Sequence, residues 1–277
     1  MNRFFVVTND GKDKDHSVTN QLKELLVAAG KECILCEKDE RKKIRREKIP
    51  TGIDCVIVIG GDGSLIEVAR VFYGKNIPIL GVNMGTLGYL TEVEVSHLQE
   101  AIDKIAANDY EMEDRMMLEG RFPNGTSDVA LNDIVVSRKG ELRVIHFNLF
   151  VNGELLNSYK ADGVIISTPT GSTAYNLSAG GPIVEPTASL VVITPICSHA
   201  LNTSSVVLSA DDEIVIEIDQ GRNGTIEEVF VAFDGTDPVT LVTGDTVTIR
   251  KSDAATKIMK LSKVSFLEIL RRKMKGN

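Results

Sequence analysis

A single carboxylate stands among small residues in the stretch Gly60-Gly61-Asp62-Gly63-Ser64. Glycines lack a Cβ, so backbone N–H groups can come close to a ligand, and such a turn suits a phosphate group. A carboxylate repels phosphate unless a metal ion lies between them or it takes a proton from an attacking hydroxyl. The stretch therefore indicates phosphoryl transfer. The plainer interpretation is a strand-to-helix turn in which Asp62 only makes a hydrogen bond.

A second polar stretch, residues 168–182, is dense in hydroxyl side chains and also carries an aromatic residue and three glycines. A dinucleotide site needs hydroxyl and backbone N–H groups for ribose and phosphate, and an aromatic side chain for a ring face. We therefore favour a dinucleotide-binding loop over a surface loop solvated by its own side chains. The candidate binding residues in it are Thr170, Thr173, Ala174, Tyr175, Asn176, Leu177 and Ser178.

Asn132 and Asp133 lie inside the apolar run 129–136, where a polar pair is unfavourable in a strand. The pair is either a bulge or strand end in solvent, or a hydrogen-bonding pair that recognises adenine or ribose. Asp133 and Asp162 both suit acceptance of hydrogen bonds from hydroxyls or amides. Arg143 and Lys160 are candidate cations for a pyrophosphate, although either alone is more typical of a solvated strand residue.

The elements around the turn are predicted from short apolar runs. Residues 55–59 form an unbroken apolar run, typical of a strand buried on both faces of a parallel sheet. Ser64-x-x-Glu67 reads as a capping box, which predicts a helix start. Residues 77–82 form another buried strand that ends at Asn83. Because ligands bind at the carboxyl edge of parallel strands, Gly60, Gly61, Gly63, Ser64 and Asn83 are the candidate phosphate-binding residues.

The rest of the chain predicts two domains. Strands at 3–8 and 32–35 flank a helical pattern, and this β-α-β unit predicts a parallel, Rossmann-like sheet. Ser96-x-x-Gln99 predicts a capped helix. From 117 to 250 short β-rich runs predict a β-sandwich-like domain. The tail at 265–274 is helical, opens with the capping box Ser265-x-x-Glu268 and is expected to pack back on the first domain. The fold class is thus α/β plus all-β, with an α/β domain at 1–113 plus 255–277 and an all-β domain at 114–254.

Composition narrows the classes of protein. The 277 residues carry 31 basic and 39 acidic side chains, a net charge of −8, which argues against nucleic acid as the main partner. No apolar segment is long enough to span a membrane, and the N-terminus reads as a strand instead of a signal peptide. The four cysteines predict free thiols and a reducing, cytoplasmic compartment. Cys33-x-x-Cys36 is either a pair of buried strand cysteines, which we favour, or a zinc or redox site.

The glycine turn resembles the signature of NAD kinases, which diacylglycerol and sphingosine kinases share. Residues 83–90, 131–133 and 162–176 resemble NAD kinases specifically, and so do residues 194–197. The pattern departs from the family at Ser198, at Ser204-Ser205 and at Thr236, and Lys160 stands where the family commonly has Arg.

The resemblance implies an enzyme that phosphorylates the adenosine-ribose 2′-hydroxyl of NAD with ATP to give NADP. It implies ATP with Mg²⁺ or another divalent metal at the turn, without dedicated protein ligands for the metal. It also implies a homodimer or homotetramer, and NAD contacts from the Asn132–Asp133 pair, Asp162, the 173–178 loop, Arg143 and Lys160. Asp62 then accepts the proton of the hydroxyl, and Gly63 also lies against NAD.

Two other functions and one segment stay open. A lipid or sphingoid-base kinase would share the glycine turn, but the polar 168–180 loop argues against it. A dinucleotide-binding regulator without chemistry would gain nothing from Asp62 beside phosphate. The charged run 37–48 is either a solvated loop or short helix, or a lid that brings cations to ATP.

Overall fold

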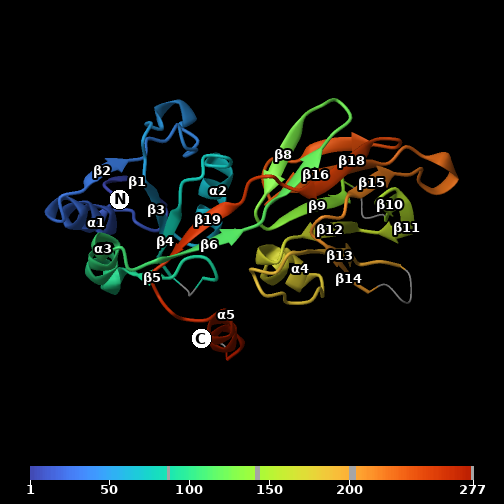
Figure 1. Ribbon diagram of the computed structural model, residues 1–277. Helices are drawn as coiled ribbons and strands as arrows, with labels where there is room; N and C mark the ends of the chain where they lie inside the picture. The colour runs from blue at the N-terminus through green and yellow to red at the C-terminus, as the bar shows by residue number, and fades with distance from the viewer. Residues whose placement is uncertain (86–87, 141–143, 200–203, 276–277) are drawn as a thin grey trace. The chain divides into compact units, whose positions relative to one another are not determined.

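The computed structural model describes residues 1–85, 88–140, 144–199 and 204–275 (Figure 1). The chain divides into two compact units, each with its own hydrophobic core. The first comprises Met1–Asp114 and Ala255–Asn277, and the second comprises Arg115–Ala254.

The first unit is built on a seven-stranded sheet in the order β2-β1-β3-β4-β19-β6, with β5 paired to β4. β1 to β5 pair in parallel, and so do β4 and β19. β3 is buried along its whole length, as its apolar run predicts. The strands are β1 (Arg3–Thr8), β2 (Glu32–Leu35), β3 (Cys55–Gly60), β4 (Ile79–Asn83), β5 (Val93–Glu94), β6 (Glu111–Arg115) and β19 (Thr256–Lys260).

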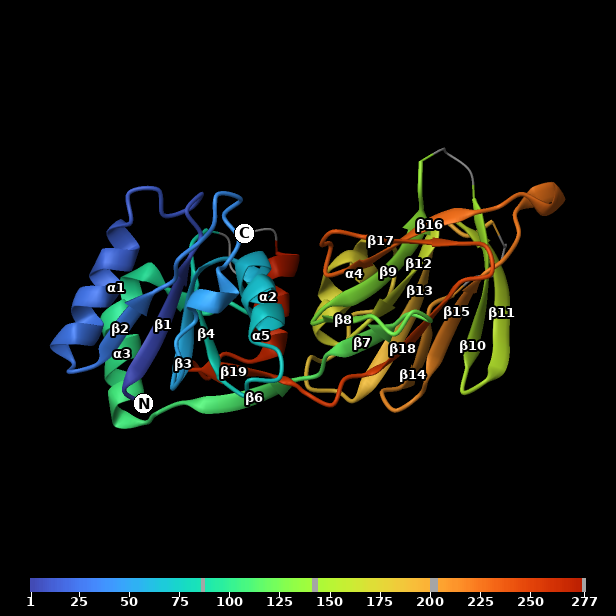
Figure 2. The same ribbon diagram turned by 90° about the horizontal axis from the view of Figure 1, so that it is seen from above.

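Helices cover both faces of this sheet. In Figure 2, α1 and α3 lie on one side of it and α2 lies on the other. α3 has the most complete apolar stripe, and Leu98, Ala101, Ile102 and Ile105 on that stripe are buried. The helices are α1 (Ser17–Ala28), α2 (Asp62–Val71), α3 (Leu98–Ala107) and α5 (Phe266–Met274), with short 3₁₀ turns η1 (Arg46–Lys48) and η2 (Val95–His97).

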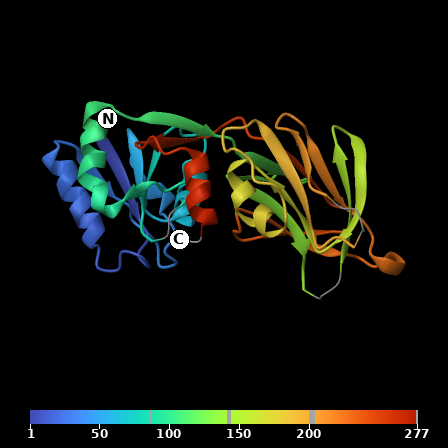
Figure 3. The same ribbon diagram turned by 90° about the horizontal axis from the view of Figure 1, so that it is seen from below.

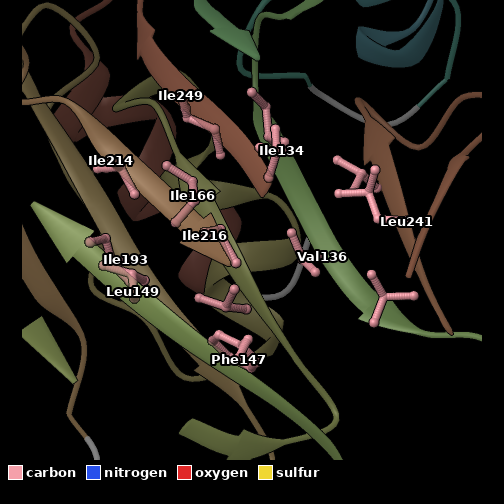
Figure 4. Packing of buried hydrophobic residues seen from close by; sticks show 14 of the residues in the cluster. Ile134, Val136, Phe147, Leu149, Ile166, Ile193, Ile214, Ile216, Leu241 and Ile249 are labelled. Atoms are coloured by element: carbon pink, nitrogen blue, oxygen red, sulfur yellow. The ribbon is translucent and has the colours of Figure 1, made fainter. Parts of the chain in front are cut away.

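The second unit is a sandwich of two six-stranded antiparallel sheets. Their orders are β11-β10-β15-β18-β7-β8 and β14-β13-β12-β9-β16-β17. Alternate residues of each strand point between the sheets. Figure 4 shows this core, in which Ile134 and Val136 of β9 face Phe147 and Leu149 of β10.

The bounds of these elements complete the fold. The strands are β7 (Leu118–Arg121), β8 (Ser127–Ala130), β9 (Asp133–Arg138), β10 (Ile145–Val151), β11 (Glu154–Ala161), β12 (Gly163–Ser167), β13 (Leu190–Ile196), β14 (Val206–Ser209), β15 (Ile214–Ile218), β16 (Glu228–Phe233), β17 (Val239–Val242) and β18 (Thr246–Lys251). The short helices are η3 (Thr170–Thr173), α4 (Tyr175–Ser178) and η4 (Arg222–Gly224).

The predicted fold class is confirmed, including the return of the C-terminal helix α5, red in Figure 3, to the first unit. Of the three predicted helix caps, one is present in the structure and two are not. Ser265 does cap α5, because its hydroxyl accepts the backbone N–H of Glu268 at 3.2 Å. The Ser64 capping box is wrong: α2 begins at Asp62 with Gly61 as its N-cap, so the N–H of Ser64 already bonds Gly61. Ser96 likewise caps no helix, since it lies inside η2.

The charged run 37–48 folds into a small hairpin. Lys38 and Ile44 form an antiparallel bridge, Ile44 is buried, and η1 follows. The Lys38 ammonium donates to the Thr8 carbonyl and pairs with the Asp10 carboxylate at 2.9 Å. The run is therefore anchored to the carboxyl end of β1.

All four cysteines are free thiols. Burial raises the pKa of Cys33, of Cys36 to about 11 and of Cys55 to about 12, so these thiols are protonated at neutral pH. Within the described ranges, no three His, Cys, Asp or Glu side chains gather closely enough to hold a metal ion. None of the helices described is both long and apolar enough to cross a membrane.

Candidate active site

Asp62 is the first residue of α2, directly after β3 and the Gly61 cap. Its carboxylate accepts four hydrogen bonds. Oδ2 accepts the backbone N–H of Tyr89 at 2.7 Å. Oδ1 accepts the N–H groups of Leu90 and Thr91 at 3.1 and 3.0 Å and the Thr91 hydroxyl at 3.1 Å. The carboxylate thus fixes residues 89–91 against the start of α2.

A side chain on Gly60 would clash with Ser64, and one on Gly61 would displace the end of the Lys12 side chain. A Cβ on Gly60 would lie 2.6 Å from the Ser64 hydroxyl oxygen, and one on Gly61 would lie 2.8 Å from the Lys12 ammonium. The Ser64 hydroxyl accepts a hydrogen bond from the Asn9 amide at 2.9 Å, which ties α2 to the end of β1. The glycines therefore allow a close approach between strand end, helix start and the first loop.

A cavity of about 530 Å³ lies beside the turn at the carboxyl edge of the sheet. It is lined by Lys12, Asn83, Met84, Gly85, Glu94, Val95 and Ser96. Asn83 pairs with Gly60 across β4 and β3, which brings the predicted phosphate-binding residues together. Asn83 is 8% exposed, its amide nitrogen donates to the Gly85 carbonyl, and its Oδ1 has no hydrogen-bond partner among the described residues. A buried amide oxygen without a partner is a position where a ligand or its hydration shell supplies the missing hydrogen bond.

Lys12 is a functional candidate that the sequence reasoning missed. It follows β1 by four residues, and its ammonium lies next to both Gly61 and Gly85. The available signal was its position: β1 is parallel to β3, so the loop after β1 ends at the same sheet edge as the glycine turn.

In the second unit, Asp133 opens β9 and lies next to Asp234, which follows β16. The Asp234 carboxylate accepts the backbone N–H groups of Leu131, Asn132 and Asp133 at 2.8, 2.7 and 3.2 Å. Asp133 is 5% exposed. Burial, and then the charge of Asp234, raise the pKa of Asp133 to about 7, so its carboxyl group is largely protonated below neutral pH.

The loop 168–182 divides into buried and exposed candidates. Asn176 is fully buried, and its side chain donates to the carbonyls of Ser172 and Pro182 and accepts from the Thr194 hydroxyl at 2.6 Å. Its three hydrogen bonds are internal, so it shapes the loop. Thr170 is 6% exposed, and its hydroxyl oxygen lies 3.4 Å from a guanidinium nitrogen of Arg115, which donates to it. Tyr175, Leu177 and Ser178 are exposed, whereas Thr173 and Ala174 are half-buried.

The structure does not bring all predicted NAD-binding residues together. Asp133 pairs with Ser167 at one end of β12, whereas Asp162 precedes Gly163 at the other end. With about 3.3 Å per residue, the backbone positions of Asp162 and Thr168 are about 20 Å apart. Asp162 lies 3.5 Å from the Arg138 guanidinium, and Lys160 beside it is exposed. Arg143 lies outside the described residues.

Comparisons with known proteins cover nearly the whole chain. Residues 4–110 match the family described as ATP-NAD kinase N-terminal domain, and residues 131–261 match the ATP-NAD kinase C-terminal domain. The NAD kinase of Lachnospira eligens is 44% identical over 294 residues, which cover 99% of this chain and 100% of the relative. The NAD kinase of Agathobacter rectalis is 45% identical, with 100% of this chain and 99% of the relative covered.

Two solved structures share the fold. A yeast NADH kinase complexed with NADH has a TM-score of 0.87 at 22% identity, with 100% of this chain and 88% of the other covered. An NAD kinase from Archaeoglobus fulgidus in complex with ATP has a TM-score of 0.78 at 25% identity, with 99% and 97% covered.

Proposed function

The chain belongs to the NAD kinase family, and from that premise we propose how its residues perform the reaction. The enzyme is a phosphotransferase: the 2′-hydroxyl of the adenosine ribose of NAD attacks the γ-phosphorus of ATP, which yields NADP and ADP. A lipid or sphingoid-base kinase and a regulator without chemistry are not favoured, because the matching families and relatives are NAD kinases.

The observation that carries the proposed site is one cavity at the sheet edge, lined by Lys12 and Asn83, with the Lys12 ammonium also next to Gly61 of the glycine turn. We assign the phosphates of ATP to this cavity, against Gly60, Gly61, Gly63 and Ser64. The start of α2 attracts an anion through the partial positive charge of a helix N-terminus, although the Ser64 N–H already bonds the Gly61 carbonyl. The ammonium of Lys12 supplies a positive charge that attracts a triphosphate.

The divalent metal arrives with ATP as part of the substrate. Mg²⁺ takes oxygen ligands and usually keeps several waters beside its phosphate ligands. The Oδ1 of Asn83, which has no partner among the described residues, and the carboxylate of Glu94, its register partner on β5, are side-chain oxygens that line the cavity and can contact the waters of the metal. These residues fit a metal held chiefly by the nucleotide, with the protein contacting its hydration shell.

Asp62 accepts the proton of the 2′-hydroxyl. A carboxylate offers about four lone-pair positions, two on each oxygen. Among the described residues, Oδ1 accepts three hydrogen bonds, so two of its donors share one lone pair, whereas Oδ2 accepts one, from the Tyr89 N–H. We therefore assign the second lone pair of Oδ2 to the ribose hydroxyl. Because the other donors hold the group rigidly, the base needs no reorganisation when the hydroxyl arrives.

The second unit binds NAD. We assign the exposed part of its loop, Tyr175, Leu177 and Ser178 with Thr173 and Ala174, to direct contact with NAD, together with Asn132 and Asp133. Thr170 and Asn176 support the loop from inside. Asp162 lies at the far end of β12 from Thr168, about 20 Å away along the strand, and Lys160 lies near the end of the preceding strand β11. We assign both to the NAD bound by a second copy in a homodimer or homotetramer. The free cysteines suit the reducing cytoplasm.

A steady-state assay tests the function. We expect NADP to form from NAD with ATP and Mg²⁺, and ADP to appear in equal amount. Polyphosphate in place of ATP, and NADH in place of NAD, establish the donor and acceptor preferences. Binding of NAD without any NADP formation with either donor would leave only the regulator.

A further inference from the structure

Tyr89 is held from both its backbone and its ring. Its N–H donates the shortest of the four hydrogen bonds to Asp62, at 2.7 Å. Its ring packs against Phe266 of α5 with 6.0 Å between the ring centroids. The Lys273 ammonium, also on α5, lies 4.4 Å from the centroid of the same ring. One residue therefore connects the C-terminal helix to the carboxylate of Asp62.

Glu92 makes a second connection three residues later. Its side chain is 8% exposed and pairs with Lys260. The carboxylate also accepts the backbone N–H groups of Leu261 and Ser262 and the Ser262 hydroxyl. Leu261 and Ser262 begin the segment between β19 and α5. Residues 89–92 are thus fixed to Asp62 at one end and to the start of the C-terminal segment at the other.

The helix itself contributes little to the core. No residue of α5 belongs to the hydrophobic cluster of the described part of the first unit, and Ile269 is its one buried residue. A cavity of about 250 Å³, lined by Ile269 and Arg272 of α5 and by Ala101 and Lys104 of α3, lies between the two helices. The contacts of the Phe266 ring and the Lys273 ammonium with Tyr89 therefore stand out among the interactions of α5 within the described part of this unit.

We propose that α5 is a positioning element for catalysis: Phe266 and Lys273 hold Tyr89, which holds the Asp62 carboxylate in its reactive orientation. This proposal rests on the proposed role of Asp62. The physical reason is that small misplacements of a catalytic group have large effects on rate, about 100-fold for 1 Å. Phe266 and Lys273 act through Tyr89 and touch neither of the reacting atoms.

The test compares variants of residues that contact Tyr89 with variants of exposed residues in the same C-terminal segment. Phe266→Ala and Lys273→Met remove the contacts with Tyr89. Leu267→Ala and Lys275→Met are the matched controls, because both side chains are exposed on the same C-terminal segment. We expect about a tenfold fall in kcat for the first pair, with KM for NAD and ATP within twofold, and no change for the controls. Phe266→Tyr and Lys273→Arg should restore most of the rate.

Amide hydrogen exchange supplies a readout that a loss of overall stability would not reproduce. Exchange at residues 89–91 should rise in Phe266→Ala while exchange in β3 and β4 stays at the wild-type level. Unchanged kcat in both variants, equal losses in the controls, or faster exchange throughout the first unit would overturn the proposal. An inactive wild-type protein, or an active Asp62→Asn variant, would instead overturn the proposed role of Asp62, so the two failures are distinguishable.

Discussion

Each of the two units contains an aspartate whose carboxylate accepts hydrogen bonds from three consecutive backbone N–H groups. In the first unit the Asp62 carboxylate accepts three consecutive backbone N–H groups, those of residues 89–91. In the second unit the Asp234 carboxylate accepts those of residues 131–133. Each carboxylate fixes a turn that joins distant parts of the chain.

The surroundings give the two carboxylates different chemistry. Asp62 lies at the glycine turn, and its neighbour Gly61 lies next to the Lys12 ammonium, a positive charge. Asp234 lies beside a second carboxyl group, that of Asp133, whose pKa it helps to raise to about 7. The comparison teaches that hydrogen bonds to a carboxylate orient it, whereas burial and neighbouring charges decide the protonation state of the carboxyl groups around it.

Asp62→Asn gives the largest expected effect and tests the first half of this comparison. An amide cannot accept the hydroxyl proton, so kcat should fall about 10²–10⁴-fold, the usual contribution of a general base. NAD affinity should stay within several-fold of wild type. Single-turnover rates and NAD titrations measure the two quantities. A near-normal rate would show that Asp62 only fixes residues 89–91.

Asp133→Asn tests the second half through the pH dependence of stability. The pKa of Asp133 is about 7 in the folded protein against an ordinary value of 3.8. The folded state therefore binds the proton more tightly, so the contribution of Asp133 is fully present below pH 4 and is lost as the pH rises toward 7. At about 1.4 kcal/mol per unit, wild type should lose on the order of 4 kcal/mol relative to the variant between pH 4 and 8.

Urea unfolding at a series of pH values measures this difference between wild type and Asp133→Asn. Titrating groups distant from Asp133 are common to both proteins and cancel, whereas Asp234 titrates together with Asp133, so the difference reports the pair. Parallel stability curves would mean that Asp133 titrates as an ordinary surface carboxylate, and the contrast between the two units would then disappear.

Local patterns explain why so much of the fold could be predicted. The apolar run of β3 and the strand ending at Asn83 predict a parallel sheet with two polar loops at one edge, and the structure has Gly60 and Asn83 as register partners. Strand periodicity and glycine spacing act over a few residues, so the sequence contains them directly.

The hydrogen bonds that define the site act over long separations in sequence. Asp62 is bonded to residues 27–29 positions later, and Asp234 to residues 101–103 positions earlier. No local pattern contains such pairs. The same limit made Ser64 look like a helix cap: only the tertiary structure shows that its hydroxyl bonds Asn9.

Asp234→Asn should destabilise the second unit without a comparable loss of rate. Loss of a charged acceptor for three buried N–H groups costs about 1–3 kcal/mol. With NAD saturating, kcat should stay within a few-fold of wild type, in contrast to Asp62→Asn. The pH range over which Asp133 loses its contribution to stability should become narrower but should not disappear, because burial is the larger cause of its raised pKa. Thermal unfolding and kcat measured on the same samples check the stability loss and the rate. A loss of rate as large as that of Asp62→Asn would mean that Asp234 and Asp62 do not differ in their roles.

Lys12→Ala gives the smallest effect and sharpens the comparison from the phosphate side. If the ammonium beside Gly61 attracts the triphosphate, KM for ATP should rise about tenfold, or about 1.4 kcal/mol, while KM for NAD stays unchanged. Lys14→Ala, an exposed lysine in the same loop, is the matched control and should behave as wild type. Lys12→Arg keeps the charge and should recover most of the affinity, and the wild-type advantage should shrink at high salt because screening weakens the attraction. An unchanged KM for ATP would mean that the Lys12 ammonium does not contribute to ATP binding. Backbone N–H groups would then bind the phosphates without it.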